Sequence, residues 1–184
     1  MEPILAPESI DLIALAPVIV LSVFAMMVLI VDLFGGRNKT LLVFISLVGL
    51  LMTAISAFAK NPIPAYSFND SYIVDHLSLF FLCIFTISSA LAILLSVEYN
   101  EREGIRAGEY YALILFCTVG MILLASSTDM IMIFLGIEIV SICLYVLAGI
   151  RRGNLASNEA ALKYFLLGAF ATGFLLYGMT LVYG

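Results

Sequence analysis

Long runs of apolar residues fill most of the chain, and short polar segments separate them. A membrane-spanning helix needs about 20 such residues. The runs between polar breaks predict six spans, at about 10–33, 40–59, 74–97, 108–125, 129–149 and 158–183. The runs are continuous and do not alternate, which favours helices over the strands of a transmembrane barrel. The predicted fold is therefore all-α, a polytopic bundle of about six spans in one membrane domain, residues 1–184.

Composition supports this prediction and excludes several classes of protein. Of the 184 residues, 64% are hydrophobic and 11% are charged, and the mean hydropathy is +1.17. Soluble domains are about 45–50% apolar and about 25% charged, so a soluble enzyme, a disordered tail and a nucleic-acid binder are excluded. The three cysteines lie in apolar runs without a CxxC spacing and are interpreted as small buried thiols. Without zinc-ligand spacing, a Walker loop or GxGxxG, we expect no metal and no nucleotide site.

Basic residues are concentrated in alternate loops, which predicts the orientation of the bundle. Three loops on one side hold six of them, namely Arg37, Lys39, Arg102, Arg106, Arg151 and Arg152, against Lys60 on the other. The positive-inside rule therefore predicts that both chain ends lie outside. The acidic N-terminus has no Lys or Arg and does not suit a secretory signal, so the first run is predicted to be a retained helix. Residues 61–71, with two prolines, are predicted to form an external loop without helix.

Several polar residues at the span ends suit helix caps. Asp75 is predicted to cap the third helix. His76, the only histidine, follows it; a structural role is expected for the two residues, and the alternative is that they collect protons at the membrane surface. Asp129 suits the N-cap of the fifth helix, and Ser157 or Asn158 that of the sixth.

Glu138 is the one acidic residue deep inside a predicted span. It lies near the middle of the fifth, in FLGIEIVSICLY. A charge near the bilayer centre costs at least about 2.5–3.5 kcal/mol, and a side chain this short does not reach the interface. One interpretation is a protonated carboxyl satisfied by Ser141 and Tyr145, which share its helix face. The other, which we favour, is an ionisable group on a proton or ion path.

Lys163 is the only lysine inside a span. Glu159 stands four residues before it, the favourable order for a helical ion pair, and a lysine can also extend toward the interface. Its depth differs from that of Glu138 by roughly 9 Å, which suits two stations linked by water. A structural and a functional role are both left open for Lys163. Ala169 and Gly173, four residues apart, predict a packing face for a neighbouring helix.

The second half of the chain resembles the antiporter-like membrane subunits of respiratory complex I. The resemblance rests on FLGIEIVSICLYVLAG, SNEAALKYFLLGA and LLYGMTLVYG, with an earlier match at VDHLSLFF. The resemblance is strong after residue 109 and weak over residues 1–60. Within these antiporter-like subunits, the sequence is most similar to the subunit N (subunit 2) family of proton-translocating NADH:quinone oxidoreductases.

The resemblance implies a function and two site residues. Glu138 matches the key glutamate of the family's fifth helix, and Lys163 matches a lysine of the sixth helix that takes part in proton transfer. Quinone reduction elsewhere in the complex would drive protons through this subunit of the bacterial inner membrane. FMN, iron–sulphur clusters, NADH and quinone are expected in other parts of the complex, and no cofactor in this chain. The expected partners are neighbouring antiporter-like subunits and lipid, not nucleic acid.

The chain also departs from the family. The resemblance implies about fourteen helices with two inverted repeats, whereas six spans are predicted here. We therefore expect either the front part of a longer subunit or a split or truncated product. Two alternatives stay open: a subunit of a related cation/proton antiporter or membrane-bound hydrogenase, and a non-pumping assembly scaffold.

Overall fold

Six long helices form the protein in the computed structural model, which describes residues 14–34, 39–58, 65–68 and 70–183. All six are long and apolar enough to cross a membrane. They are α1 (Ala16–Phe34), α2 (Lys39–Phe58), α3 (His76–Arg102), α4 (Ala107–Ala125), α5 (Met130–Ala148) and α6 (Leu155–Tyr183). The predicted all-α bundle is confirmed, whereas its orientation in the membrane and its single domain stay predictions. The N-terminal residues 1–13, Arg37 and Lys60 lie outside the described residues.

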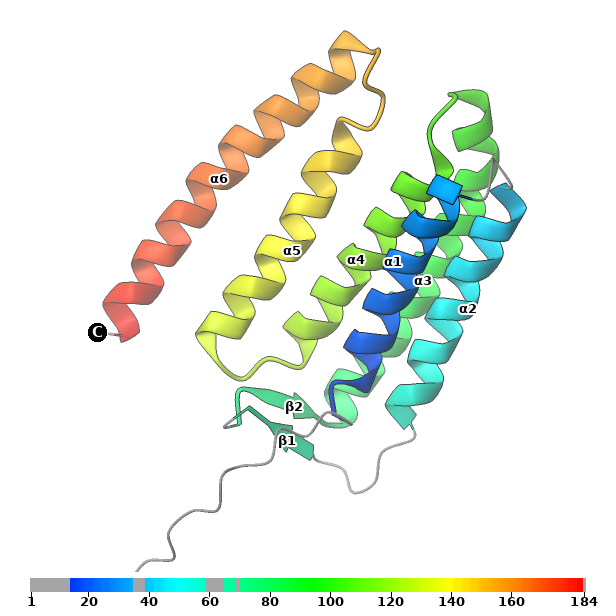
Figure 1. The fold of residues 1–184 in the computed structure, drawn as a ribbon. Coiled ribbons are helices and arrows are strands. Elements are labelled where there is room, and N and C mark those ends of the chain that lie inside the picture. The colour runs from blue at the N-terminus through cyan, green and yellow to red at the C-terminus, as the bar shows by residue number, and fades with distance from the viewer. Residues whose placement is uncertain (1–13, 35–38, 59–64, 69, 184) are drawn as a thin grey trace, which may run out of the picture.

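The helices divide into a packed group and a peripheral pair. Helices α1 to α4 lie side by side, and α4 contacts α1, α2 and α3 as well as α5 (Figure 1). Within the described residues, helix α6 makes its extensive contacts with α5, at the edge of the bundle (Figure 1). The core therefore lies between the first four helices, where Leu21, Ile93 and Leu115 are fully buried.

Hydroxyl groups follow the buried stripe of α3. Thr86, Ser89 and Ser96 are all buried there, and the Ser89 hydroxyl lies 2.6 Å from that of Thr118 on α4. Other hydroxyls donate to the carbonyl one turn earlier, as Thr86 does to Leu82. A polar group inside a membrane helix is tolerated when it is hydrogen-bonded in this way, and small side chains let the helices approach closely.

A two-stranded hairpin closes one end of the bundle. Strands β1 (Ala65–Ser67) and β2 (Tyr72–Val74) pair in antiparallel fashion. Strand β1 lies in residues 61–71, predicted as a loop without helix, whereas β2 follows that loop and ends at Val74, the predicted start of the third span. The backbone of β2 also holds the α4–α5 turn, because the Ile73 N–H donates to the Ser126 carbonyl at 2.8 Å. Burial raises the pKa of the Tyr72 phenol above its ordinary value, and a hydrogen bond with Ser126 opposes that rise. The hairpin thus fixes the point where α5 begins.

The caps of α3 and α5 agree with the sequence, and that of α6 does not. Asp75 forms a capping box with Ser78, and the Asp129 carboxylate accepts from the Ile131 N–H. Helix α6 begins at Leu155, three residues before the predicted start, because Asn154 accepts from the N–H groups of residues 156 and 157. The predicted cap at Ser157 or Asn158 is therefore wrong. Ser157 instead donates to the Ala148 carbonyl at the end of α5.

Candidate functional site

Helix α5 has two different faces. Gly136 packs on α4, since a Cβ added to it would lie 3.2 Å from the Gly120 carbonyl oxygen. Tyr145 lies on the opposite face, because nine residues at 100° each bring it half a turn round. It packs on α6, where its hydroxyl occupies the space that a side chain at Gly168 would need. Glu138 precedes Tyr145 by seven residues, almost two full turns, and therefore lies on the α6-facing side of α5.

The carboxyl group of Glu138 lacks a partner for one of its oxygens. Its Oε1 is buried and has no hydrogen-bond partner among the described residues. Ser141 and Tyr145 share the α6-facing side of α5, but neither bonds to this oxygen. The interpretation of Glu138 as a carboxyl satisfied by these two hydroxyls is therefore wrong for Oε1. A buried polar atom left unpaired costs about 1–3 kcal/mol, so its position calls for a reason other than packing.

Lys163 lies on α6 in a different environment. Its side chain is 70% exposed, and its Nζ lies 2.5 Å from Oε1 of Glu159, one turn earlier on the same helix. The ion pair suggested by their spacing is thus present. Exposed pairs of this kind contribute about 0.3–0.5 kcal/mol, so the pair orients the ammonium group more than it stabilises the helix.

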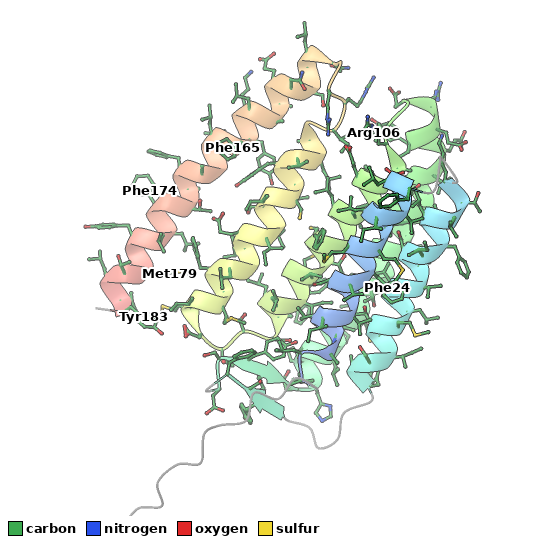
Figure 2. All side chains as sticks on the ribbon, viewed as in Figure 1. Phe24, Arg106, Phe165, Phe174, Met179 and Tyr183 are labelled. Atoms are coloured by element: carbon green, nitrogen blue, oxygen red, sulfur yellow. The ribbon has the colours of Figure 1, made fainter. Side chains whose placement is uncertain are left out.

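Contacts at both ends fix the register of α5 against α6. At one end, a Cβ on Gly149 would lie 2.9 Å from that of Ala161. At the other end, the Tyr183 hydroxyl donates to the Asp129 carboxylate at 3.1 Å. Figure 2 shows Tyr183 at this end of the pair, while Phe174 points away from α5.

This register separates Glu138 from Lys163. Gly149 and Ala161 mark the same level on the two helices. At about 1.5 Å per residue, Glu138 lies about 16 Å below this level along α5, and Lys163 lies about 3 Å below it along α6. The count from the opposite end gives a similar difference, so the two groups lie about 15 Å apart along the helix axes. The predicted 9 Å is too short because α6 begins early and its first turns project beyond the end of α5. The structure therefore does not bring the two residues into contact.

Tyr145 is the site residue that sequence reasoning valued too little. Its ring packs edge-on against Tyr164, with centroids 4.8 Å apart, and against Phe165 at 5.8 Å. It therefore stands on the α6-facing side of α5 between the levels of Glu138 and Lys163. Its spacing from Glu138 was the signal, but spacing alone does not tell which helix that side of α5 contacts.

Ion pairs join the α5–α6 loop to the α3–α4 region. Arg151 contacts Glu103 at 2.6 Å, and Arg152 contacts Glu109 at 2.9 Å. Glu109 also accepts from Arg106 at 3.2 Å, so one carboxylate bridges two arginines. From the sequence, the three arginines predicted only the orientation of the bundle. The sequence did predict that the loops after the third and fifth spans lie on the same side of the membrane, and this placement could have indicated ion pairs between them.

Small residues on α6 are divided between two sides. The partly buried positions Ala161, Gly168 and Thr172 repeat every four to seven residues and form the side toward α5. A Cβ added to Gly173 would meet no atom within 4 Å, and Ala169 is exposed. The predicted packing face at Ala169 and Gly173 therefore does not contact α5.

The comparisons with known proteins identify relatives of the whole chain. A family described as NADH:quinone oxidoreductase/Mrp antiporter, transmembrane, matches residues 127–184. NADH-quinone oxidoreductase subunit N of Trichlorobacter lovleyi is 47% identical over 96% of this chain and 37% of the relative. Subunit N of Chloroflexus aggregans is 41% identical over 95% of this chain and 36% of the relative.

A solved structure is similar as well. It is a chain of respiratory complex I from Thermus thermophilus with bound aureothin, at a TM-score of 0.69 and 34% identity. The match covers 91% of this chain and 36% of that chain. The chain thus spans a little more than a third of the length of these relatives.

Proposed function

The chain belongs to the subunit N family of NADH-quinone oxidoreductases, and we propose that it forms part of a proton path across the bacterial inner membrane. In this proposal, quinone reduction elsewhere in the complex drives the proton transfer. Neighbouring antiporter-like subunits and lipid are the partners. NADH, FMN, iron–sulphur clusters and quinone act on other subunits, so the task of this chain is to hold and move protons.

The buried oxygen of Glu138 is the observation that carries the proposal. It is unpaired among the described residues and lies near the middle of a membrane helix, on the α6-facing side of α5. An ionisable residue at such a depth is typical of ion and proton pathways. A carboxyl group at this position offers an oxygen to which a proton can be added from a neighbouring hydroxyl or water molecule.

Lys163 serves as a second station in the proposal, toward the loop end of the pair. The separation of about 15 Å along the axes excludes direct transfer between the two groups. Intermediate carriers are needed, and the hydroxyls of Ser141 and Tyr145 lie on the α6-facing side of α5 in the intervening interval. Water molecules would fill the gaps between these hydroxyls and complete the proton path. The Lys163 ammonium could move from Glu159 toward this path of hydroxyls and water. Such a movement would change the electrostatic potential along the path of the proton.

Replacement of Glu138 by glutamine in the native complex tests the proposal. The change keeps the size of the side chain and removes its exchangeable proton. We expect NADH-driven proton uptake into inverted vesicles to fall severalfold, while the amount of assembled complex stays unchanged. Glu101→Gln is the matched control, because Glu101 is an exposed carboxylate paired with Lys39 at 3.5 Å. Wild-type pumping in Glu138→Gln would contradict the proposed role.

Lys163 is tested by contrast with its ion-pair partner. Lys163→Gln removes the proton carrier, whereas Glu159→Gln breaks the same ion pair and leaves the lysine. We expect Lys163→Gln to lower proton uptake and Glu159→Gln to preserve most of it. Equal effects of the two changes would show that only the ion pair matters. If Glu138→Gln and Lys163→Gln both pump normally, the scaffold interpretation is favoured instead.

The description of the matched family favours one second candidate, a subunit of a cation/proton antiporter. This candidate predicts proton movement that depends on sodium and continues without NADH oxidation. Vesicles that hold the native complex, assayed with and without sodium and with and without NADH, distinguish the two functions.

A further inference from the structure

A cavity of about 710 Å³ opens at one end of the bundle, between the α3–α4 loop and the α5–α6 loop. It lies at the opposite end of α5 from the hairpin and beyond the levels of Glu138 and Lys163. Its polar lining comes from both loops and the neighbouring helix ends: Glu103, Arg106, Glu109, Arg151, Arg152 and Asn154.

The charged side chains that line the cavity carry one more positive charge than negative charges. Three guanidinium groups face two carboxylates, so the fully ionised cavity carries one net positive charge. Both carboxylates are already paired with arginines. An anion with a single negative charge would therefore balance the cavity, and a phosphodiester is such a group.

Two of the arginines keep free donor capacity. Arg106 and Arg152 each direct one nitrogen to Glu109, yet their side chains are 74% and 77% exposed. A guanidinium has five N–H donors in a planar fork that matches phosphate oxygens. The N–H groups of Ala156 and Ser157 in the first turn of α6 already donate to Asn154, so the two arginines are the charged donors that remain for a ligand.

The position of the cavity suits a lipid more than a solute. It lies at the ends of helices that cross the membrane, where phospholipid headgroups lie. Apolar side chains of Ile105, Ile150 and Leu155 line it together with the charges. Basic pockets between membrane helices bind anionic headgroups.

We propose that this cavity binds the phosphodiester headgroup of an anionic phospholipid, held by Arg106 and Arg152. The proposal is independent of the proton path, since it uses neither Glu138 nor Lys163. The lipid would stabilise the contact between the two loops by neutralising the one positive charge that their ion pairs do not balance.

Native mass spectrometry of the delipidated complex, titrated with phosphatidylglycerol, tests the proposal. Arginine near an anionic lipid contributes roughly a fivefold change in affinity, so the double variant Arg106→Gln/Arg152→Gln should bind about thirtyfold more weakly. Arg102→Gln is the matched control, because Arg102 ends α3 near the cavity but does not line it. Its affinity should stay within about twofold of the wild type, and an equal loss in this control would overturn the proposal.

Glu109→Gln separates lipid binding from a purely structural role of the ion pairs. It breaks the same contacts to Arg106 and Arg152 but raises the net charge of the cavity. We expect it to bind phosphatidylglycerol about fivefold more tightly than the wild type. Weaker binding in Glu109→Gln, as in the arginine variant, would mean that the pairs only hold the loops, and would overturn the proposal.

The source of the phosphate group is tested by competition. With a lipid ligand, phosphatidylglycerol is preferred to zwitterionic phosphatidylcholine, and millimolar inorganic phosphate does not displace it. Displacement by inorganic phosphate would identify a soluble anion as the ligand and would contradict the lipid assignment.

Discussion

Helices α4 and α6 have the same mean hydropathy over their most apolar windows, but they pack in opposite ways. Helix α4 buries eleven residues, whereas α6, over its described residues 155–183, buries none. Hydropathy therefore predicts that a helix crosses the membrane, not what it contacts there. The difference lies in position, because α4 packs against four other helices, whereas the described part of α6 makes extensive contacts only with α5.

Helix α5 stands between these two environments. Its α4-facing side packs closely through Gly136, and its opposite side carries Glu138. Helix α5 therefore holds Glu138 on the side that faces away from the packed group.

Gly120→Leu should have the largest effect. A Cβ at Gly120 would lie 2.9 Å from Ile139 and Val140 and 3.1 Å from the Gly136 carbonyl, so backbone would have to move. Overpacking of this kind costs about 1–3 kcal/mol or more. We expect a marked fall in the melting temperature of the purified protein. Gly178→Leu on α6 is the control, because its Cβ meets no atom within 4 Å. A similar fall in both variants would remove the contrast between α4 and α6.

Gly168→Ala should have a smaller effect. The added methyl group would collide with the Tyr145 hydroxyl, the end of a side chain that can turn aside. We expect a loss of about 1 kcal/mol in unfolding free energy, measured by denaturant titration, and altered fluorescence of the displaced tyrosine. Gly173→Ala, with no atom within 4 Å, should match the wild type. If Gly173→Ala is the more harmful change, the face that we assign to α5 is wrong.

Tyr72→Phe should have the smallest effect, since it removes one hydrogen bond from the hairpin, worth about 0.5–1.5 kcal/mol. Burial raises the pKa of this phenol, so the folded protein keeps the proton after the unfolded chain has lost it. Stability from Tyr72 is therefore complete below pH 10.0, the ordinary pKa, and is lost as the pH rises above it. Melting curves between pH 8 and 11, run beside Tyr72→Phe, should show a steeper fall in the wild type. Parallel slopes would argue against a buried neutral phenol.

The sequence predicts most of the fold because apolar runs and polar breaks mark six membrane helices directly. It also predicts the caps at Asp75 and Asp129, which depend on a local pattern. The hairpin was missed because its strands are three residues long, although an Asn-Asp pair between Tyr66 and Tyr72 was a turn signal. Asp70 adopts a positive φ of 63° there, which aspartate tolerates better than most residues.

The candidate site is predicted less completely. The depth of Glu138 follows from counting residues along one helix, and its position on α5 agrees with that count. The distance to Lys163 depends on how α6 slides against α5, and the contacts that set it, Gly149 with Ala161 and Tyr183 with Asp129, join residues on different helices. Sequence patterns within one helix carry no information about such a register.

The central claim is that Glu138 exchanges a proton during turnover. The most direct measurement is the infrared difference spectrum of the native complex between rest and NADH-driven turnover, with wild-type, Glu138→Gln and Glu101→Gln proteins. The proposal predicts a change in a protonated-carboxyl band that is present in the wild type and in Glu101→Gln and is lost in Glu138→Gln. The same band change in Glu138→Gln would contradict it.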